Sequence, residues 1–525
     1  MKRLVERNVV VKDWRKTPVK VALVYPGGYR AGMTGLTVQL LYHLFNLRED
    51  TLCERVFLDG SKPPRSLESG RTLRDFDLVA ATIQYEGGYV ELLKGLRDSG
   101  IPLRRSERGD RHPLIVAGGP CVTANPTVME DYVDVFAIGD AEPFIERLVD
   151  AYRENRSRKG LLEVLSDVPG FYVPGFTENP VERAWVEELD KAPHPTAQVI
   201  PLIDEGSPLC PVFGLTLGLE VTRGCGRMCL FCLASWINMP VRHRGLETML
   251  GIVEEGLRRT GVRKVSLVGA GATDNRWLKD LCQHLVSMGI EFSTPSLRMD
   301  LLDRELMRLI VQGGQRTLTL APETASEEVR RLIGKPIPDD RLLEVSENAY
   351  EAGFKRLKLY FMIGLPGEDR DSLEGVGRLV DKLARTGFRD IHVSVNPFIP
   401  KAQTPFQWLP LASRSYLTEA SKLIRRSMPK GLNVRLDILK PAQAELQALL
   451  SLGDRRTGRV VEYMALSGGG RGALRRAVKI AGLRLENVVY RAKEVEEPLP
   501  WDMIRSSDFR LLKKLYRKLE SELVR

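Results

Sequence analysis

Short apolar runs alternate with amphipathic segments over the first 160 residues of the chain. The apolar run Val19 to Tyr25 is typical of a buried strand, and leucines recur at helical spacing from Leu36 to Asn46. Three further strand-like runs follow, at 76–83, 114–117 and 133–138. Strands that alternate with helices in this way predict an α/β fold with a doubly wound, Rossmann-like parallel sheet.

Glycines follow two of these predicted strands, at the edge where parallel sheets bind their ligands. Gly118, Gly119 and Gly139 would line that edge. Tight turns between strands and helices explain the same glycines equally well, so the sequence leaves both interpretations open.

The pattern changes twice in the rest of the chain. Residues 161–212 lose the periodicity and contain eight prolines, which predicts a connector. About six strand–helix units then follow over 213–410 and favour a full or partial (β/α) barrel. Charged helical segments fill 411–525 and predict a small, mainly helical, basic domain. We therefore expect a Rossmann-like domain at 1–160, then the connector, the barrel and the helical domain.

Composition limits the class of protein. The chain has 525 residues, of which 43% are hydrophobic, and the formal net charge is +10. No apolar run is long enough to span a membrane, and the basic start has no apolar run behind it, so we expect a cytoplasmic protein. The positive charge permits a nucleic-acid partner, although a general abundance of charged residues would produce the same balance.

Three of the seven cysteines lie on one loop, directly after a predicted barrel strand. Cys225, Cys229 and Cys232 have the spacing C-x3-C-x2-C. Three thiolates can hold three irons of a [4Fe–4S] cluster and leave the fourth iron open to a ligand that is not protein. Structural zinc sites use four ligands. His243 could supply the fourth, which would make the chain a zinc-stabilised nucleic-acid-binding module.

The cysteine motif, with Phe231 just before its last cysteine and a barrel strand before its first, resembles that of the radical S-adenosylmethionine (SAM) enzymes. The similarity extends to the subgroup with an N-terminal cobalamin-binding-like domain, related to YgiQ-type proteins. It covers roughly residues 19–505 and includes the stretches 240–244, 295–298, 320–323, 358–367, 400–408, 453–456 and 500–502.

This resemblance implies specific roles. The three cysteines would bind the cluster, and the amino and carboxylate groups of SAM would chelate the open iron. Further contacts to SAM would come from Phe231, Gly269, Gly271, Ser296, Arg298, Glu323 and the backbone at Ile363. Reductive cleavage of SAM would give a 5′-deoxyadenosyl radical, used for methylation or another modification of an unactivated carbon. The partner would be a low-potential electron donor of the ferredoxin or flavodoxin type.

The N-terminal region departs from one cobalamin pattern. Many cobalamin proteins carry Asp-x-His-x-x-Gly after the first strand, whereas residues 26–35 contain neither Asp nor His. His43 lies in the next helix at an apolar spacing, where a packed side chain is expected. Cobalamin could bind without a protein ligand, cradled by 118–120 and 139–142, or the domain could be empty. In the second case, the basic segment 510–518 would favour cobalamin-independent modification of RNA or a ribosomal component.

Overall fold

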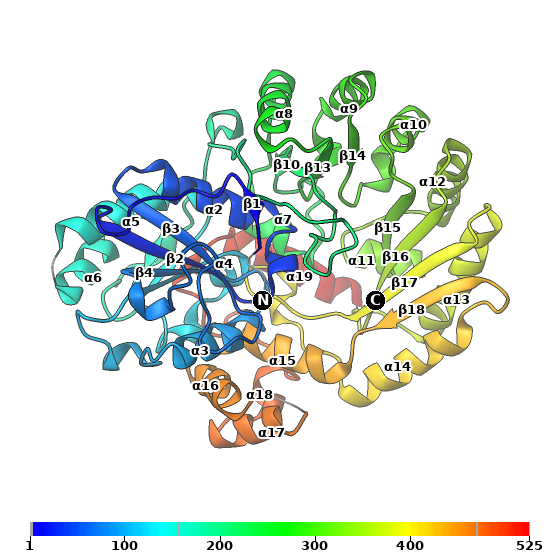
Figure 1. The fold of residues 1–525 in the computed structure, drawn as a ribbon. Helices are drawn as coiled ribbons and strands as arrows, with labels where there is room; N and C mark the ends of the chain where they lie inside the picture. The colour runs from blue at the N-terminus through cyan, green and yellow to red at the C-terminus, as the bar shows by residue number, and fades with distance from the viewer. Residues whose placement is uncertain (1–3, 156, 469–470, 524–525) are drawn as a thin grey trace.

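A six-stranded sheet forms the N-terminal part of the structure, with the strand order β3-β2-β4-β5-β6-β7. The computed structural model describes residues 4–155, 157–468 and 471–523, and this sheet lies on the left in Figure 1. The first five strands of that order run parallel, whereas β7 pairs antiparallel with β6. The strands are β2 (Val19–Tyr25), β3 (Thr51–Phe57), β4 (Leu78–Thr82), β5 (Leu114–Gly118), β6 (Val135–Ala137) and β7 (Phe171–Tyr172).

Helices cover both faces of this sheet, because alternate residues of each strand point to opposite sides. Val21 and Leu23 of β2 pack with α2 and α5, whereas Ala22 and Val24 belong to the core that contains α3. The helices of this part are α1 (Tyr29–Gly32), α2 (Leu36–Leu47), α3 (Gly88–Asp98), α4 (Pro120–Ala124), α5 (Glu142–Glu154) and α6 (Arg158–Ser166). The predicted doubly wound sheet is confirmed.

Strand β3 is absent from the sequence prediction because two charged residues interrupt its apolar pattern. Every residue of β3 is buried, including Glu54 and Arg55. The Arg55 guanidinium lies 2.6 Å from Glu6 Oε2 and 2.7 Å from Glu68 Oε1. Burial of a charge is tolerated where a partner of opposite charge is held against it.

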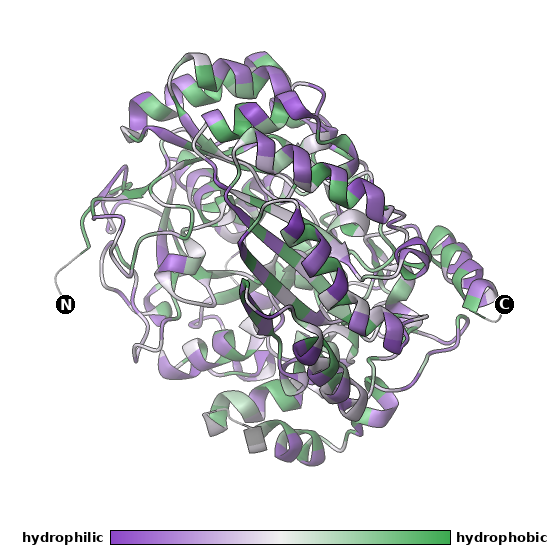
Figure 2. Cartoon of the chain, turned by 90° about the vertical axis from the view of Figure 1, so that its right-hand side faces the viewer, coloured by the Kyte–Doolittle hydropathy of each residue, from purple (hydrophilic) through white to green (hydrophobic). Residues whose placement is uncertain are grey.

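Seven parallel strands form the second part, in two hydrogen-bonded groups, β10-β13-β14 and β15-β16-β17-β18. Helices that are hydrophobic on one side and hydrophilic on the other flank these strands (Figure 2). This arrangement is a partial (β/α) barrel. Its strands are β10 (Leu217–Glu220), β13 (Lys264–Val268), β14 (Glu291–Ser293), β15 (Thr317–Glu323), β16 (Arg356–Ile363), β17 (Asp390–Pro397) and β18 (Asn433–Ile438). Its helices are α7 (Leu233–Ile237), α8 (Leu246–Thr260), α9 (Leu278–Ser287), α10 (Arg304–Gln312), α11 (Glu327–Leu332), α12 (Asp339–Ala352), α13 (Arg370–Arg385) and α14 (Arg414–Ser427).

Strand β18 lies inside 411–525, the range predicted to be mainly helical. It pairs with β17 from Asn433 to Ile438 and so extends the barrel sheet beyond residue 410. None of its residues is fully buried, because it is an edge strand whose polar residues alternate with apolar ones. A strand of this kind has no continuous apolar run to mark it in the sequence.

Short strand pairs and helices join the two parts. The pairs are β1 (Glu6–Arg7) with β9 (Ile200–Pro201), β8 (Val181–Glu182) with β19 (Ile504–Arg505), and β11 (Thr222–Arg223) with β12 (Arg242–His243). The last helices are α15 (Pro441–Leu452), α16 (Gly458–Ser467), α17 (Arg471–Ile480), α18 (Leu485–Val488) and α19 (Phe509–Leu523). In the described part of the chain, no helix has the length and apolar character needed to cross a membrane.

Candidate active site at the cysteine loop

The three predicted metal ligands lie at the carboxyl end of β10. Cys225 and Cys229 are buried and Cys232 is half-buried, directly before α7. Gly224, before the first cysteine, has φ +90°, and a Cβ there would lie 2.7 Å from the Asn238 carbonyl oxygen. Trp236 Nε1 donates a hydrogen bond to the Cys229 carbonyl at 3.0 Å. The loop is therefore held by backbone and aromatic contacts that leave the thiols uninvolved.

The side chains around the loop fit an iron–sulfur cluster better than a zinc ion. Among the described residues, no three His, Cys, Asp or Glu side chains are grouped as metal ligands. Burial raises the pKa of the Cys229 thiol to about 12, against the opposing effect of Lys335. His243 Nδ1 lies 3.0 Å from Thr222 Oγ1, so a hydrogen bond occupies that ring nitrogen. Three thiols on one loop fit the iron–sulfur chemistry, in which soft thiolates are preferred.

An acidic and a basic side chain act on Cys229: Glu323 at the end of β15, and Lys335 after α11. Glu323 has φ +69° at a register shift in β15 and is 9% exposed. Lys335 Nζ lies 2.6 Å from Glu323 Oε1. The segment before Lys335 contacts the cysteine loop, since the Leu230 N–H donates to the Ile333 carbonyl at 3.0 Å. Backbone strain of this kind clusters at functional sites. Lys335 was not predicted, because only the folded chain brings it to Glu323.

Glycines at the end of β13 allow this strand to reach the cysteine loop. A Cβ on Gly269 would lie 2.7 Å from the Thr222 carbonyl oxygen. A Cβ on Gly271 would lie 3.2 Å from Cys225 Cα and 2.8 Å from Asp274 Oδ2. Both glycines are therefore needed for this close approach.

Arg298 is linked to the cysteine loop indirectly, by two aspartates that contact both the arginine and the loop. Its guanidinium lies 2.5 Å from Asp274 Oδ1 and 2.7 Å from Asp300 Oδ2. Asp274 Oδ2 accepts from the Gly226 N–H at 3.4 Å, and Asp300 also pairs with Arg227 at 2.6 Å. Arg298 thus already has two acidic partners. Ser296 is exposed and makes no hydrogen bond with another described residue.

The two remaining predicted SAM contacts are Phe231, on the cysteine loop itself, and Ile363, the last residue of β16. Phe231 is half-buried and packs against the apolar cluster that includes Ile333 and Leu365. Ile363 is fully buried, and its carbonyl accepts from the Phe398 N–H at 2.8 Å. The next residue, Gly364, donates its N–H to Glu368 Oε1 at 2.7 Å. The Ile363 side chain is therefore closed to a ligand, which leaves the backbone contact to adenine as a prediction.

A cavity of about 620 Å³ separates the N-terminal sheet from the cysteine loop. Small residues of β4, β5 and β6 form the floor of the cavity, and apolar residues of α2 and α5 form its walls. Helix α7 lines the cavity from the barrel side. The three glycines predicted to line the edge of the sheet all line this cavity: Gly118, Gly119 and Gly139. A Cβ on Gly118 would be 3.6 Å from Ala137 Cβ, in ordinary contact. Gly119 and Gly139 have φ of +102° and +124°, so the turns themselves also require them.

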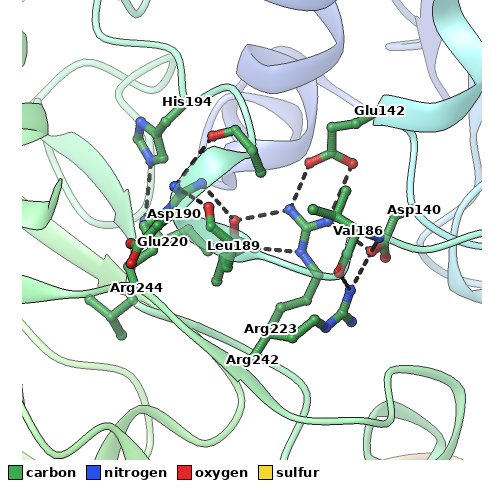
Figure 3. A network of polar contacts seen from close by, with 12 residues as sticks. Asp140, Glu142, Val186, Leu189, Asp190, His194, Glu220, Arg223, Arg242 and Arg244 are labelled. Atoms are coloured by element: carbon green, nitrogen blue, oxygen red, sulfur yellow. Dashed lines mark hydrogen bonds and ion pairs between the residues drawn. The ribbon is translucent and has the colours of Figure 1, made fainter.

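An ion network closes one side of this cavity and ties the two parts together (Figure 3). Arg223 lies two positions before Cys225, and its guanidinium is 3.1 Å from Asp140, 2.9 Å from Glu142 and 2.9 Å from Glu220. Burial acts to lower the pKa of Arg223, but the three carboxylates outweigh burial and raise this pKa above its ordinary value.

Asp140 also forms an ion pair with a second arginine, Arg242 of β12, at 2.6 Å. Burial acts to raise the pKa of Asp140, but Arg223 and Arg242 outweigh it and bring the pKa below its usual range. Asp140 therefore stays ionised between two arginines, and the edge of the N-terminal sheet is fixed against the cysteine loop.

Sequence comparisons identify the family of both parts. The family described as "Radical SAM superfamily" matches residues 219–380, and the one described as "Radical SAM proteins, N-terminal" matches 37–174. The uncharacterised protein MJ0966 of Methanocaldococcus jannaschii is 31% identical over 445 residues, which cover 84% of this chain and 90% of that protein. The chain belongs to the radical SAM superfamily.

Two further relatives extend this assignment. An uncharacterised methyltransferase of Pyrococcus horikoshii, PH0819, is 26% identical to this radical SAM enzyme, over 70% of this chain and 78% of its own. The structure of the radical SAM methyltransferase TsrM from Kitasatospora setae, with cobalamin and a [4Fe–4S] cluster bound, matches with a TM-score of 0.56. The match covers 88% of this chain and 100% of that chain at 13% identity, so it establishes a shared fold.

Proposed function

We propose that this radical SAM enzyme binds a [4Fe–4S] cluster through Cys225, Cys229 and Cys232, cleaves SAM reductively and methylates an unactivated carbon. The observation that carries this proposal is the cavity between the N-terminal sheet and the cysteine loop, with its glycine and alanine floor. It offers a second cofactor a place directly beside the loop that would hold the first. When bound, the cluster would supply an electron to the sulfonium of SAM, and homolysis would give a 5′-deoxyadenosyl radical.

Residues around the cysteine loop would position SAM. Gly269 and Gly271 bring the backbone of β13 within reach of the loop, and Glu323 would accept hydrogen bonds from the ribose or the amino group. Lys335 holds the Glu323 carboxylate in one orientation and lowers the local negative charge. Ser296 and Arg298 would face the methionine carboxylate or the ribose, and Phe231 and the backbone at Ile363 the adenine. The barrel would thereby exclude water from the reactive carbon.

Cobalamin would occupy the cavity beside α7. Its lining is mainly apolar, and Gly118, Gly119 and Gly139 would let the chain approach a large flat cofactor closely. No histidine lies in that lining, so the cobalamin would have no histidine ligand from these residues. Bound there, cobalamin would supply a methyl carrier next to the SAM site. Relatives with methyltransferase activity in their names support this choice of reaction.

Product analysis tests the proposal. The full chain is reconstituted anaerobically with iron, sulfide and cobalamin and incubated with SAM and a chemical reductant. Mass spectrometry should detect both 5′-deoxyadenosine and S-adenosylhomocysteine when a methyl acceptor is present, and the absorbance of the purified protein should show a bound corrinoid. Formation of 5′-deoxyadenosine alone, by protein without corrinoid, would favour the cobalamin-independent modification of RNA. A colourless, zinc-replete protein would contradict both.

A further inference from the structure

A second cavity, of about 710 Å³, opens on the outer side of the cysteine loop. Met228, between the first two cysteines, lines it, together with Trp236, which is hydrogen-bonded to the Cys229 carbonyl. The opposite wall comes from the C-terminal segment through Arg505, Phe509 and Arg510. This cavity therefore joins the protein surface to the cysteine loop.

Helix α19, in red in Figure 1, forms part of the rim of this cavity and packs against the loop. Its buried residues Leu512 and Tyr516 share an apolar cluster with Trp236, and Met228 packs against that cluster. The centroids of the Trp408 and Tyr516 rings lie 5.2 Å apart, so an aromatic contact also holds the helix in place. The face of α19 turned away from this cluster is polar and exposed.

That face carries excess positive charge. Five of the fifteen residues of α19 are basic and two are acidic. Glu496 pairs with Lys513 and Arg517, whereas Arg510 and Lys514 are exposed and form no ion pair with any described residue. They lie one turn apart, so both project from the same side of the helix. Arg505 stacks over the Phe509 ring at 5.1 Å beside them.

The cavity also holds an unsatisfied donor. Nη1 of Arg183 is buried and has no hydrogen-bond partner among the described residues. Arg183 lines the cavity with Arg505 and Arg510. Guanidinium groups bind carboxylates through charge-assisted hydrogen bonds, so the exposed Arg510 and the half-buried Arg505 suit a carboxylate from outside the chain. We call Arg183, Arg505, Phe509, Arg510 and Lys514 the α19 surface.

Reductive cleavage of SAM consumes one electron, which has to reach the cysteine loop from another molecule. We propose that the α19 surface is the docking site for an acidic, low-potential electron-carrier protein, an inference that rests on the proposed function. In each encounter, one electron would pass from the reduced carrier to the cluster that Cys225, Cys229 and Cys232 would hold. The carrier would be oxidised by one electron and the cluster reduced by one, with no bond made or broken.

The surface suits a protein better than a nucleic acid. Glu182 and Asp508 are exposed and line the same cavity, where they would repel a continuous phosphate backbone. Phe509, Met228 and Leu511 add an apolar patch between the charges. A small patch of mixed apolar and charged residues is typical of transient redox encounters, which bury little surface and are steered by charge.

Reduction by a protein carrier, compared with reduction by a small molecule, tests this inference. The reconstituted full chain is supplied with SAM and either reduced flavodoxin, which is acidic, or titanium(III) citrate. The double variant Arg510→Glu and Lys514→Glu should raise the KM for flavodoxin roughly tenfold or more at low ionic strength and remove most of its salt dependence. The rate with titanium(III) citrate should stay unchanged, because that reductant needs no docking surface.

A matched double variant controls for net charge. Arg389→Glu and Lys430→Glu change two exposed residues that lie before β17 and before β18, at the opposite end of the barrel strands. This control should behave as the unaltered enzyme with both reductants. An unchanged KM for flavodoxin in the α19 double variant would overturn the docking site. Loss of RNA binding by this variant in a mobility-shift assay, with reduction by flavodoxin unaffected, would overturn it as well. Failure of the unaltered enzyme to cleave SAM with titanium(III) citrate would instead contradict the proposed function.

Discussion

Arg223 Nη2 lies 2.9 Å from Glu142 Oε1, which connects the cysteine loop of the barrel to the first turn of α5 in the N-terminal part. Asp140 and Glu220 complete the shell around this guanidinium, and all four side chains are at most 13% exposed. The cavity next to the loop keeps its shape because both of its sides are attached to one arginine.

Replacing that arginine should cost far more stability than replacing an exposed one. Arg223→Gln leaves Glu142 buried without a cation and takes one of two arginines from Asp140 and from Glu220, so we expect a loss of about 3–5 kcal/mol. Arg455→Gln is the control, since Arg455 pairs with Asp131 at 60% exposure and should cost less than about 1 kcal/mol. Thermal unfolding of both variants measures the difference, and equal melting temperatures would show that the network does not hold the two parts together.

Glu368 should make the stability of the protein depend on pH. Burial raises its pKa to about 7, although Tyr416 and the backbone N–H groups of Gly364 and Leu365 oppose this. The folded state therefore binds the proton more tightly than the unfolded state, in which the pKa is about 4.5. The contribution of Glu368 to the free energy of unfolding is therefore fully present below pH 4.5 and is lost as the pH rises through about 7.

The variant Glu368→Gln should remove that dependence while still accepting a hydrogen bond from Gly364. Relative to the variant, the unaltered protein should lose on the order of 1–3 kcal/mol between pH 5 and pH 8, allowing for partial solvent screening. Urea unfolding midpoints at both values of pH provide the measurement. A constant difference between the two proteins would mean that Glu368 titrates normally.

Filling the cavity beside α7 should prevent corrinoid binding without touching the SAM site. Ala137 lines the cavity floor, and Ala137→Phe places an aromatic ring in it. We expect purified variant protein to lack bound corrinoid but still to form 5′-deoxyadenosine. Ala492→Phe, at an exposed position outside the cavity, is the control. Full corrinoid occupancy in the Ala137 variant, read from the absorbance spectrum, would locate the cofactor elsewhere.

Glu323 should contribute to SAM affinity. Glu323→Gln weakens the pair with Lys335 and makes residue 323 a poorer hydrogen-bond acceptor for the ribose or the amino group. The Kd for SAM should therefore rise roughly tenfold, which is about 1.4 kcal/mol of binding free energy. Glu328→Gln changes an exposed residue on α11 with no ion pair in the described structure and should leave the Kd unchanged. Equilibrium dialysis with the reconstituted proteins compares them, and a shared Kd would remove Glu323 from the SAM site.

The sequence predicted those parts of the fold whose apolar patterns are continuous. The sheet strands around Val21 and the barrel units were readable for this reason, and the cysteine loop from its spacing. Strand β3 was missed because Arg55 and Glu54 occur inside it, and their burial depends on partners distant in sequence. Lys335 was missed for the same reason, as only the folded chain places it against Glu323.

The cysteine loop should support reductive cleavage of SAM. The most direct measurement is the yield of 5′-deoxyadenosine from anaerobically reconstituted protein with SAM and titanium(III) citrate, for the unaltered chain and for Cys229→Ala. Cys282→Ala, which removes a buried thiol outside the loop, is the matched control. We predict product from the unaltered chain and the Cys282 variant and none from the Cys229 variant. Equal yields from the Cys229 variant and the unaltered chain would show that the cysteine loop does not hold the group that cleaves SAM.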